Sequence, residues 1–225
     1  MKFTFVTLFS NLIEPYFHDS ILKRAIESNF ISYEFYNPRD FTTNKHKKVD
    51  EQMVGGGAGM LLTCQPLFDC LDEIKSKNAD AYIVFPLAAA KPFRQNDAKR
   101  LAKKKNIVFV SGRYEGIDER VIEKYANEVF SIGEFILTGG ELPSLVMADA
   151  ISRNVEKVLG NADSLDVESY ENNLLEAPSF AKPEIFQKLS VVKEFLKGNH
   201  SKISDLKFQM SNCKTKYYRP NKEKR

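Results

Sequence analysis

The sequence predicts an α/β protein with a mostly parallel sheet and a small helical C-terminal domain, and three observations lead to this fold class. Short apolar segments of strand type alternate with segments of helical period up to about residue 155. Glycine-rich loops follow two of the strand-like segments, and the end of the chain turns polar and then basic. Strands that alternate with helices are typical of domains built on parallel sheets.

The N-terminal elements follow from composition and period. Residues 2–9, KFTFVTLF, are rich in aromatic and β-branched side chains and predict the first strand. Apolar residues at helical spacing predict a helix over 12–26, and alternation predicts a second strand over 31–36. A long polar loop is expected from 37 to 59, ending in GGGAG. A helix is expected over 66–74, with its proline at or near the first turn.

The central part of the chain predicts three more strands. They are AYIVF at 81–85, NIVFV at 106–110 and the segment 128–132, while 94–105 predicts a basic helix and 142–155 another helix. Glycine loops at 112–116 and 131–140 each follow a strand. Open α/β sheets bind ligands at the carboxyl ends of their strands, so these two loops predict a shared pocket. Each loop alone, like the glycine run at 55–59, is better explained as turn chemistry that needs positive φ.

Charge and composition divide the rest of the chain. Residues 160–175 are polar and acidic without a clear period, which predicts a flexible linker, and 176–225 predict a small helical domain. From Lys202 to Arg225 there are eight Lys or Arg and two acids, a net +6, whereas the whole chain carries +3. A basic end on a near-neutral body indicates a polyanionic partner, with a solvated, fraying terminus as the alternative.

Several functional classes are excluded by residue content. Three cysteines without a CxxC pair predict neither a disulfide framework nor a zinc site, and three histidines are too few for a His-rich metal site. The first residues lack the charged and apolar regions of a signal peptide, and no segment is long enough to span a membrane. A cytoplasmic protein is expected.

The glycine loops belong to a set of specific strings. GRYEGIDERV and SIGEFILTGGELP are the most specific, and PRDFT, GGGAGM, SRNVEKVLG, LLEAPSFAKP and KGNH accompany them across essentially the whole chain. Together they closely resemble the bacterial tRNA (guanine-N1)-methyltransferase family of the SPOUT superfamily. The resemblance implies a deep trefoil knot in a catalytic domain at 1–159. It also implies methyl transfer from S-adenosylmethionine to N1 of the guanosine 3′-adjacent to the anticodon, position thirty-seven, in tRNA.

By position, the resemblance also implies the residues of the site. Arg153 is the expected catalytic arginine and Glu168 the expected general base, where the family has an aspartate; Asp166 is the alternative. A second family aspartate becomes Glu176. The first cofactor loop departs from the usual S-P-Q-G, so only backbone contacts are expected there. The expected cofactor-binding residues are Pro86, Leu87, Gly112, Tyr114, Glu115, Gly116, Ser131, Ile132, Gly133, Glu134, Phe135, Ile136, Leu137, Gly139, Gly140 and Pro143.

The expected partners follow from the same resemblance and from the basic end. Lysine and arginine bind phosphates, and aromatic side chains stack on splayed bases of an RNA loop such as the anticodon loop. The family implies a homodimer whose site is shared between subunits. It also implies dependence on magnesium, for which Glu115 is a candidate ligand. The basic run at 99–105 is interpreted as the solvent face of a helix. The residues expected to bind tRNA are Lys202, Lys214, Lys216 and Arg219.

The chemistry explains why a carboxylate and an arginine are needed. N1 of guanine carries a proton that a base must remove, and the negative charge that develops on O6 needs a cationic donor. Two other functions stay open. One is a nucleotide-dependent oxidoreductase or a Rossmann-type methyltransferase. Against it, the sequence has no GxGxxG motif after the first predicted strand. A non-catalytic RNA-binding protein with the same fold is supported only by the Asp-to-Glu change.

Overall fold

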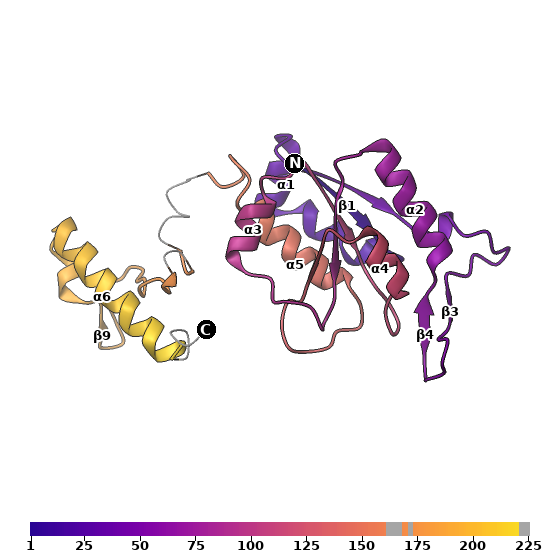
Figure 1. Ribbon diagram of the computed structural model, residues 1–225. Helices are drawn as coiled ribbons and strands as arrows, with labels where there is room; N and C mark the ends of the chain where they lie inside the picture. The colour runs from indigo at the N-terminus through magenta and orange to yellow at the C-terminus, as the bar shows by residue number, and fades with distance from the viewer. Residues whose placement is uncertain (161–167, 171–172, 221–225) are drawn as a thin grey trace. The chain divides into compact units, whose positions relative to one another are not determined.

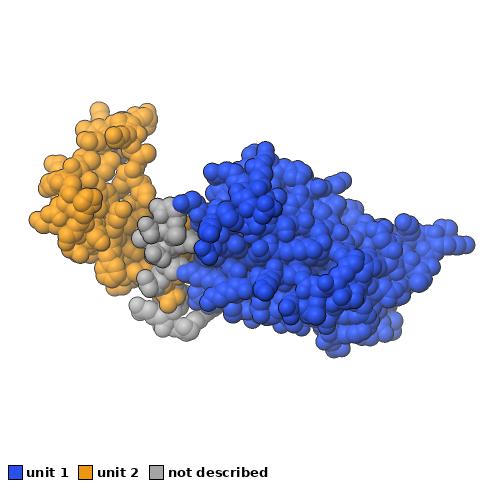
Figure 2. Space-filling model, turned by 90° about the horizontal axis from the view of Figure 1, so that it is seen from above, with its two compact units in different colours: residues 1–160 blue, residues 161–225 orange. Residues whose placement is uncertain are grey.

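The computed structural model describes residues 1–160, 168–170 and 173–220, so Asp166 lies outside the described residues. The chain divides into two compact units, Met1–Gly160 and Asn161–Arg225. Figure 2 shows them in separate colours. Each unit is described by itself.

The first unit contains a five-stranded sheet in the order β2-β1-β6-β5-β7, and every pair of neighbours is parallel. The predicted fold class, α/β with a mostly parallel sheet, is therefore confirmed; the knot stays a prediction. The middle strand β6 is buried along its whole length, which explains its continuous apolar run. The strands are β1 Lys2–Val6, β2 Ser32–Tyr36, β5 Tyr82–Pro86, β6 Asn106–Val110 and β7 Glu128–Phe130.

Helices cover both faces of this sheet (Figure 1). Successive strand residues point to opposite faces, so Ile107 and Phe109 of β6 join one apolar cluster and Val108 and Val110 the other. The first cluster is closed by α1 Ser20–Glu27, α3 Gln95–Leu101 and α5 Glu141–Ser152. The second is closed by α2 Cys64–Lys77 and α4 Glu119–Tyr125.

The helix expected over 12–26 is wrong as a single element. The segment forms two 3-10 helices, η1 Ser10–Leu12 and η2 Glu14–His18, before α1 begins. Pro15 stands at the start of η2, where a missing N–H is tolerated. Asp19 then accepts a hydrogen bond from the backbone N–H of Ser20 and caps α1.

The segment 37–59, expected to be one long loop, contains a short helix and a strand. A 3-10 helix, η3 Pro38–Asp40, is followed by strand β3 Asp50–Gln52, which pairs antiparallel with β4 Met60–Leu62. The glycine run connects these two strands and does not open a helix. Gly55 and Gly57, at φ 94° and 122°, illustrate the positive φ that the turn requires, so the turn interpretation is confirmed.

The second unit is built around one long helix, α6 His200–Tyr218. Asn199 caps it by accepting a hydrogen bond from the N–H of Lys202 at 3.2 Å. The helical character expected here is present, but a short antiparallel hairpin, β8 Ile185–Phe186 and β9 Leu189–Ser190, and a 3-10 helix, η6 Lys193–Leu196, precede it. In the described part of the chain, no helix is long and apolar enough to cross a bilayer.

Candidate active site

The loops after β5 and β7 are joined by backbone hydrogen bonds. The N–H of Leu87 donates to the carbonyl of Phe130 at 2.8 Å. Further along, the N–H of Ser131 donates to Lys91 O at 2.9 Å, and the N–H of Phe93 donates to Ser131 O at 2.8 Å. Two of the loops expected to hold the cofactor are thus held together where β7 ends.

The loop after β6 also meets the loop after β7, at a point further along the chain. The N–H of Gly140 donates to the carbonyl of Gly112 at 2.9 Å, and Arg113 and Gly139 form an isolated antiparallel bridge. A Cβ atom on Gly140 would lie 2.8 Å from Ser111 Cα and 2.9 Å from Gly112 N. Glycine is therefore required here by the packing of two loops against each other. All three loops meet in one region of the first unit.

A buried ion pair joins the loop after β6 to the end of the loop after β7. Arg113 Nε lies 2.9 Å from Glu141 Oε2, with only 16% and 3% of the two side chains exposed. Thr7 Oγ1 donates to the other carboxylate oxygen of Glu141 at 2.7 Å. Arg113 Nη1 also donates to Thr138 O at 3.3 Å. Glu141 is the first residue of α5, where the helix dipole favours negative charge.

Arg113 and Glu141 are not among the residues expected at the site, although both stand inside the strings that carry the resemblance. A usable signal was present: Arg113 is the single cation in the strings GRYEG and SIGEFILTGGELP, and Glu115, Glu134 and Glu141 are their acids. Two opposite charges in loops that share a pocket are expected to pair.

The residues expected to bind the cofactor differ in exposure along these loops. Ser131, Gly140 and Pro143 are buried, whereas the apolar run Phe135–Leu137 is exposed, Ile136 by 82%. Backbone groups beside accessible apolar side chains suit a ligand with a flat apolar base and a polar ribose. This chemistry fits the adenosine part of S-adenosylmethionine.

Arg153 lies at the other end of α5, as its C-cap residue. It lines a pocket of about 270 Å³ along that helix, together with Tyr16, Leu142, Leu145, Val146, Asp149 and Ala150. In this pocket Tyr16 Oη donates to Asp149 Oδ2 at 2.8 Å, and this hydrogen bond raises the pKa of Tyr16. Arg153 therefore stands beside a mainly apolar surface that also carries a carboxylate.

Comparison with known proteins identifies the family. A sequence model of the family described as tRNA (Guanine-1)-methyltransferase TrmD matches residues 1–225. The chain belongs to this family. Proteins named tRNA (guanine-N(1)-)-methyltransferase from Sulfurimonas denitrificans and Sulfurovum sp. are each 66% identical to it over 220 residues, covering 98% of this chain and 95% and 97% of theirs. A Campylobacter jejuni protein of that name is 58% identical over 224 residues, 98% of this chain and 96% of its own.

Family membership confirms the resemblance that the strings carried and the prediction that the chain is an enzyme. The expected site residues fall in different parts of the chain. The cofactor loops and Arg153 belong to the first unit, and Glu168 belongs to the second. This division places the two expected catalytic groups in separate units.

Glu115, the candidate magnesium ligand, is an exposed residue of the second loop. Its N–H donates to Met60 O at 3.0 Å, which joins the β3–β4 hairpin to this loop. A Cβ atom on Gly59 would lie 2.6 Å from Glu115 Oε1, so the carboxylate rests against the end of the glycine turn. Among the residues that the structure describes, no three His, Cys, Asp or Glu side chains form a group able to hold a metal ion.

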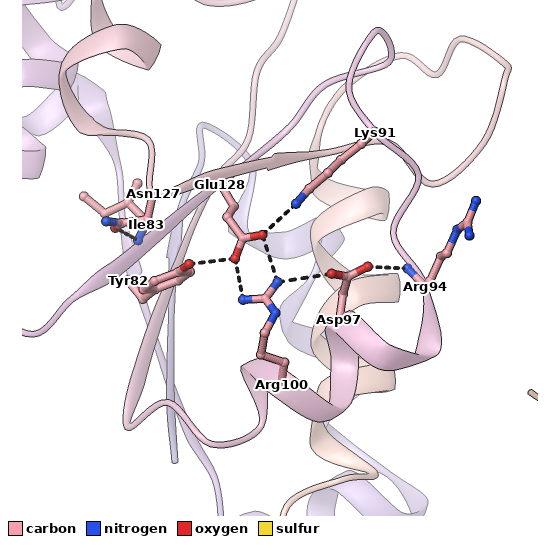
Figure 3. Close-up of polar contacts among 8 residues, drawn as sticks. All are labelled: Tyr82, Ile83, Lys91, Arg94, Asp97, Arg100, Asn127 and Glu128. Atoms are coloured by element: carbon pink, nitrogen blue, oxygen red, sulfur yellow. Dashed lines mark hydrogen bonds and ion pairs between the residues drawn. The ribbon is translucent and has the colours of Figure 1, made fainter. Parts of the chain in front are cut away.

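A polar network outside the loops fixes the start of β7 (Figure 3). Glu128 accepts hydrogen bonds from Tyr82 Oη at 2.6 Å, from both Arg100 nitrogens at 2.7 and 2.8 Å, and from Lys91 Nζ at 3.0 Å. Burial by itself raises the pKa of Glu128, but these three donors outweigh it and lower that pKa to about 2. Because Lys91 O also accepts the hydrogen bond from the N–H of Ser131, the network fixes the segment that follows the expected cofactor residues Pro86 and Leu87.

The four residues expected to bind tRNA do not share one environment. Lys202 and Lys216 are exposed on α6, whereas Lys214 is half-buried. Arg219 is the C-cap residue of α6, and its guanidinium lies 5.2 Å from the centre of the Tyr170 ring. Of these four residues, Arg219 is the one placed against an aromatic ring of the same unit.

Proposed function

We propose that this protein transfers the methyl group of S-adenosylmethionine to N1 of the guanosine 3′-adjacent to the anticodon, position thirty-seven, in tRNA. Its relatives carry the name tRNA (guanine-N(1)-)-methyltransferase, which supports the substrate and the reaction. The observation that carries the proposal is the joining of three loops after β5, β6 and β7 by backbone hydrogen bonds and the buried Arg113–Glu141 pair. As a tRNA-modifying enzyme it is proposed to act in the cytoplasm.

The three joined loops are the proposed cofactor site. When bound, S-adenosylmethionine supplies a methyl group on a positively charged sulfur. The residues proposed to hold it are those predicted from the sequence, from Pro86 and Leu87 through Gly112 and Tyr114–Gly116 to Ser131–Leu137, Gly139, Gly140 and Pro143. Fixed loops orient a ligand before it reacts, and this positioning is a main source of rate enhancement in transfer reactions.

Glu168 and Arg153 are the proposed catalytic residues. The Glu168 carboxylate takes the proton from N1, so that the N1 electron pair becomes available to form the new bond to carbon. The negative charge left on the base is shared with O6, where the guanidinium of Arg153 stabilises it. Glutamate keeps the function of the family's aspartate and adds one methylene group. Magnesium, with Glu115 as ligand, is proposed as an additional requirement.

A homodimer with a shared site is the proposed assembly. The surface around the Arg153 pocket is apolar and open: Leu142 is 55%, Val146 43% and Tyr16 50% exposed. A contiguous apolar patch of this kind marks an interaction surface. A second copy of the chain that covered it would bring its own linker residues within reach of Arg153. The anticodon loop is proposed to bind the basic end of the chain, with Lys202 and Lys216 on phosphates.

The test is methyl transfer to a defined RNA. The purified protein is incubated with methyl-labelled S-adenosylmethionine and two tRNA transcripts that differ only in the base 3′ of the anticodon, guanosine or adenosine. The proposal expects 1-methylguanosine at that position in the first transcript, found by mass spectrometry of nuclease digests, and no label in the second. Label at another position, or on another atom of the base, would contradict it.

A further inference from the structure

A ridge at the end of α6 consists of Ser211, Thr215 and the C-cap residue Arg219. Ser211 and Thr215 are four residues apart in the helix, which places them one above the other, and Arg219 follows four positions later. Ser211 is buried, although it is a small polar residue on a mostly exposed helix. Polar groups are seldom buried without hydrogen-bond partners, so the contacts of this ridge indicate what it holds.

The first two residues of the ridge bind both backbone groups of Leu175. The N–H of Leu175 donates to Thr215 Oγ1 at 2.8 Å, and Ser211 Oγ donates to the Leu175 carbonyl. Thr215 Oγ1 in turn donates to the carbonyl of Ser211 at 2.7 Å, so the hydroxyl is used both as donor and as acceptor. Two hydroxyls one turn apart therefore clamp a single peptide segment to the helix.

The clamped segment is folded back on itself beside Glu168. The N–H of Glu176 donates to Ser169 Oγ at 3.1 Å, and the N–H of Tyr170 donates to the carbonyl of Leu174 at 2.6 Å. The last ridge residue, Arg219, lies over the Tyr170 ring. Contacts at Leu175 and at Tyr170 thus attach the described residues that follow Glu168 to α6.

We infer that the ridge Ser211–Thr215–Arg219 positions Glu168, and that Arg219 acts through Tyr170 and not on a tRNA phosphate. This inference rests on the proposed function. The helix then has two separate tasks. Lys216 and Lys202 are fourteen positions apart, about 40° around a helix, and lie roughly 100–140° from Thr215. One side of α6 remains open for tRNA while another holds the segment that carries the base, so docking of the RNA on α6 brings the base with it.

Single-turnover methyl transfer by the full-length protein tests this inference. In the double variant Ser211→Ala/Thr215→Val, the rate constant should fall about tenfold, because displacements of the order of 1 Å already slow transfer steps strongly. The dissociation constants for tRNA and for S-adenosylmethionine should stay within about twofold. Ser204→Ala removes an exposed hydroxyl that lies roughly 120–160° around α6 from Lys216 and Lys202; it is the matched control and should leave all three values unchanged.

The stacking contact has its own variants. Tyr170→Leu should slow transfer severalfold at unchanged tRNA affinity, and Tyr170→Phe should restore the rate, because the ring under Arg219 is kept. Arg219→Ala should behave like Tyr170→Leu. If Arg219→Ala instead weakens tRNA binding and lowers its dependence on salt, the residue is a phosphate contact and the inference is overturned.

Hydrogen exchange at the Leu175 amide separates this inference from the proposed function. The clamp predicts exchange at least about tenfold faster in the Ser211→Ala/Thr215→Val variant than in the wild type. Unchanged exchange would show that the clamp does not hold the segment. If the wild-type protein transfers no methyl group to tRNA, the proposed function fails, and the exchange measurement still decides whether the ridge holds the segment at Leu175.

Discussion

In the first unit, the functional loops are joined by backbone hydrogen bonds and by the buried Arg113–Glu141 pair. In the second unit, the segment after Glu168 is held by two hydroxyl groups of α6 and by the stacked Arg219. Ser211 is the one buried residue among those described in this helix. The first arrangement resists opening, because opening would separate the Arg113–Glu141 pair and break several backbone hydrogen bonds at once. The second depends on a few contacts that each contribute little.

The difference fits the two tasks that we propose. A small cofactor needs a site that is ordered before it binds, since ordering on binding lowers affinity. A base that must reach a large RNA can be supplied by the unit that binds the RNA. Substitutions in the two units should therefore fail in different ways, the first in stability and cofactor affinity, the second in the rate of transfer.

The largest expected effect is on the chemical step. Glu168→Gln should lower the single-turnover rate by about a hundredfold or more, because an amide cannot take the N1 proton. Binding of S-adenosylmethionine should not change, since the base lies in the second unit. Glu168→Asp should keep measurable activity, and Asp166→Asn should have a mild effect. An inactive Asp166→Asn with an active Glu168→Gln would move the base to residue 166.

The second effect concerns the buried pair. Glu141→Gln leaves the Arg113 charge buried without a counter-charge, which should lower the free energy of unfolding by about 3–5 kcal/mol in urea titrations. The exposed Glu123 offers the control, since Glu123→Gln should change stability by less than about 0.5 kcal/mol. Equal stability of both variants would mean that the pair does not hold the loops.

A smaller effect is expected at the contact between the loops. Gly140→Ala places a Cβ atom 2.8 Å from Ser111 Cα, so it should cost about 1–3 kcal/mol of stability and weaken S-adenosylmethionine binding measured by calorimetry. Gly160→Ala is the matched control, because a Cβ atom there meets nothing within 4 Å. If Gly140→Ala binds S-adenosylmethionine with wild-type affinity, the cofactor site does not lie at these loops.

The Glu128 network predicts a pH dependence of stability. The pKa of Glu128 falls from its ordinary value of 4.5 to about 2 in the folded protein. Its contribution is therefore complete above about pH 4.5 and is lost as the pH falls through 2. Glu128→Gln should cost about 2 kcal/mol at pH 7, less than the shift alone implies because Arg100 and Lys91 are solvent-exposed.

The unfolding free energies of the wild type and of Glu128→Gln should converge as the pH is lowered toward 2. A difference between the two proteins that stays constant from pH 7 to pH 2 would mean that ionised Glu128 does not stabilise the folded protein. Circular dichroism during urea titration at each pH supplies the measurement.

The smallest effect concerns RNA binding. Lys202→Ala/Lys216→Ala should lower the slope of log affinity against log salt concentration by about two, one for each lost phosphate contact. Lys45→Ala/Lys105→Ala, which removes two exposed charges from the first unit, should leave the slope unchanged. Equal slopes for both double variants would refute the proposed contact surface on α6.

The sequence allowed the sheet to be predicted where burial alone determines the pattern. β6 is buried throughout, so its apolar run was unambiguous. The prediction for residues 12–26 was wrong, because it used the apolar spacing alone. Pro15 and the cap at Asp19 divide this segment into separate elements. β3 and β4 are three residues each, and β3 is polar, too short for alternation to be seen.

The site could be predicted in part. The loops of the site could be predicted, because glycine-rich segments that follow strands can be recognised from the sequence alone. The Arg113–Glu141 pair joins positions 28 residues apart and exists only because the two loops pack together. The ridge on α6 was missed for a different reason. Serine and threonine at four-residue spacing look like ordinary exposed helix positions until their partner, the Leu175 backbone, is known.

The claim that the two units bring different catalytic groups to one site can be tested with a mixed dimer. An Arg153→Ala subunit and a Glu168→Gln subunit, each with its own affinity tag, are co-expressed and the heterodimer is purified. If Arg153 of one subunit acts with Glu168 of the other, one of the two sites is intact, and the heterodimer should transfer methyl at about half the wild-type rate. If both residues act within one subunit, every site carries one substitution. Activity no higher than that of the two single-variant homodimers would contradict the shared site.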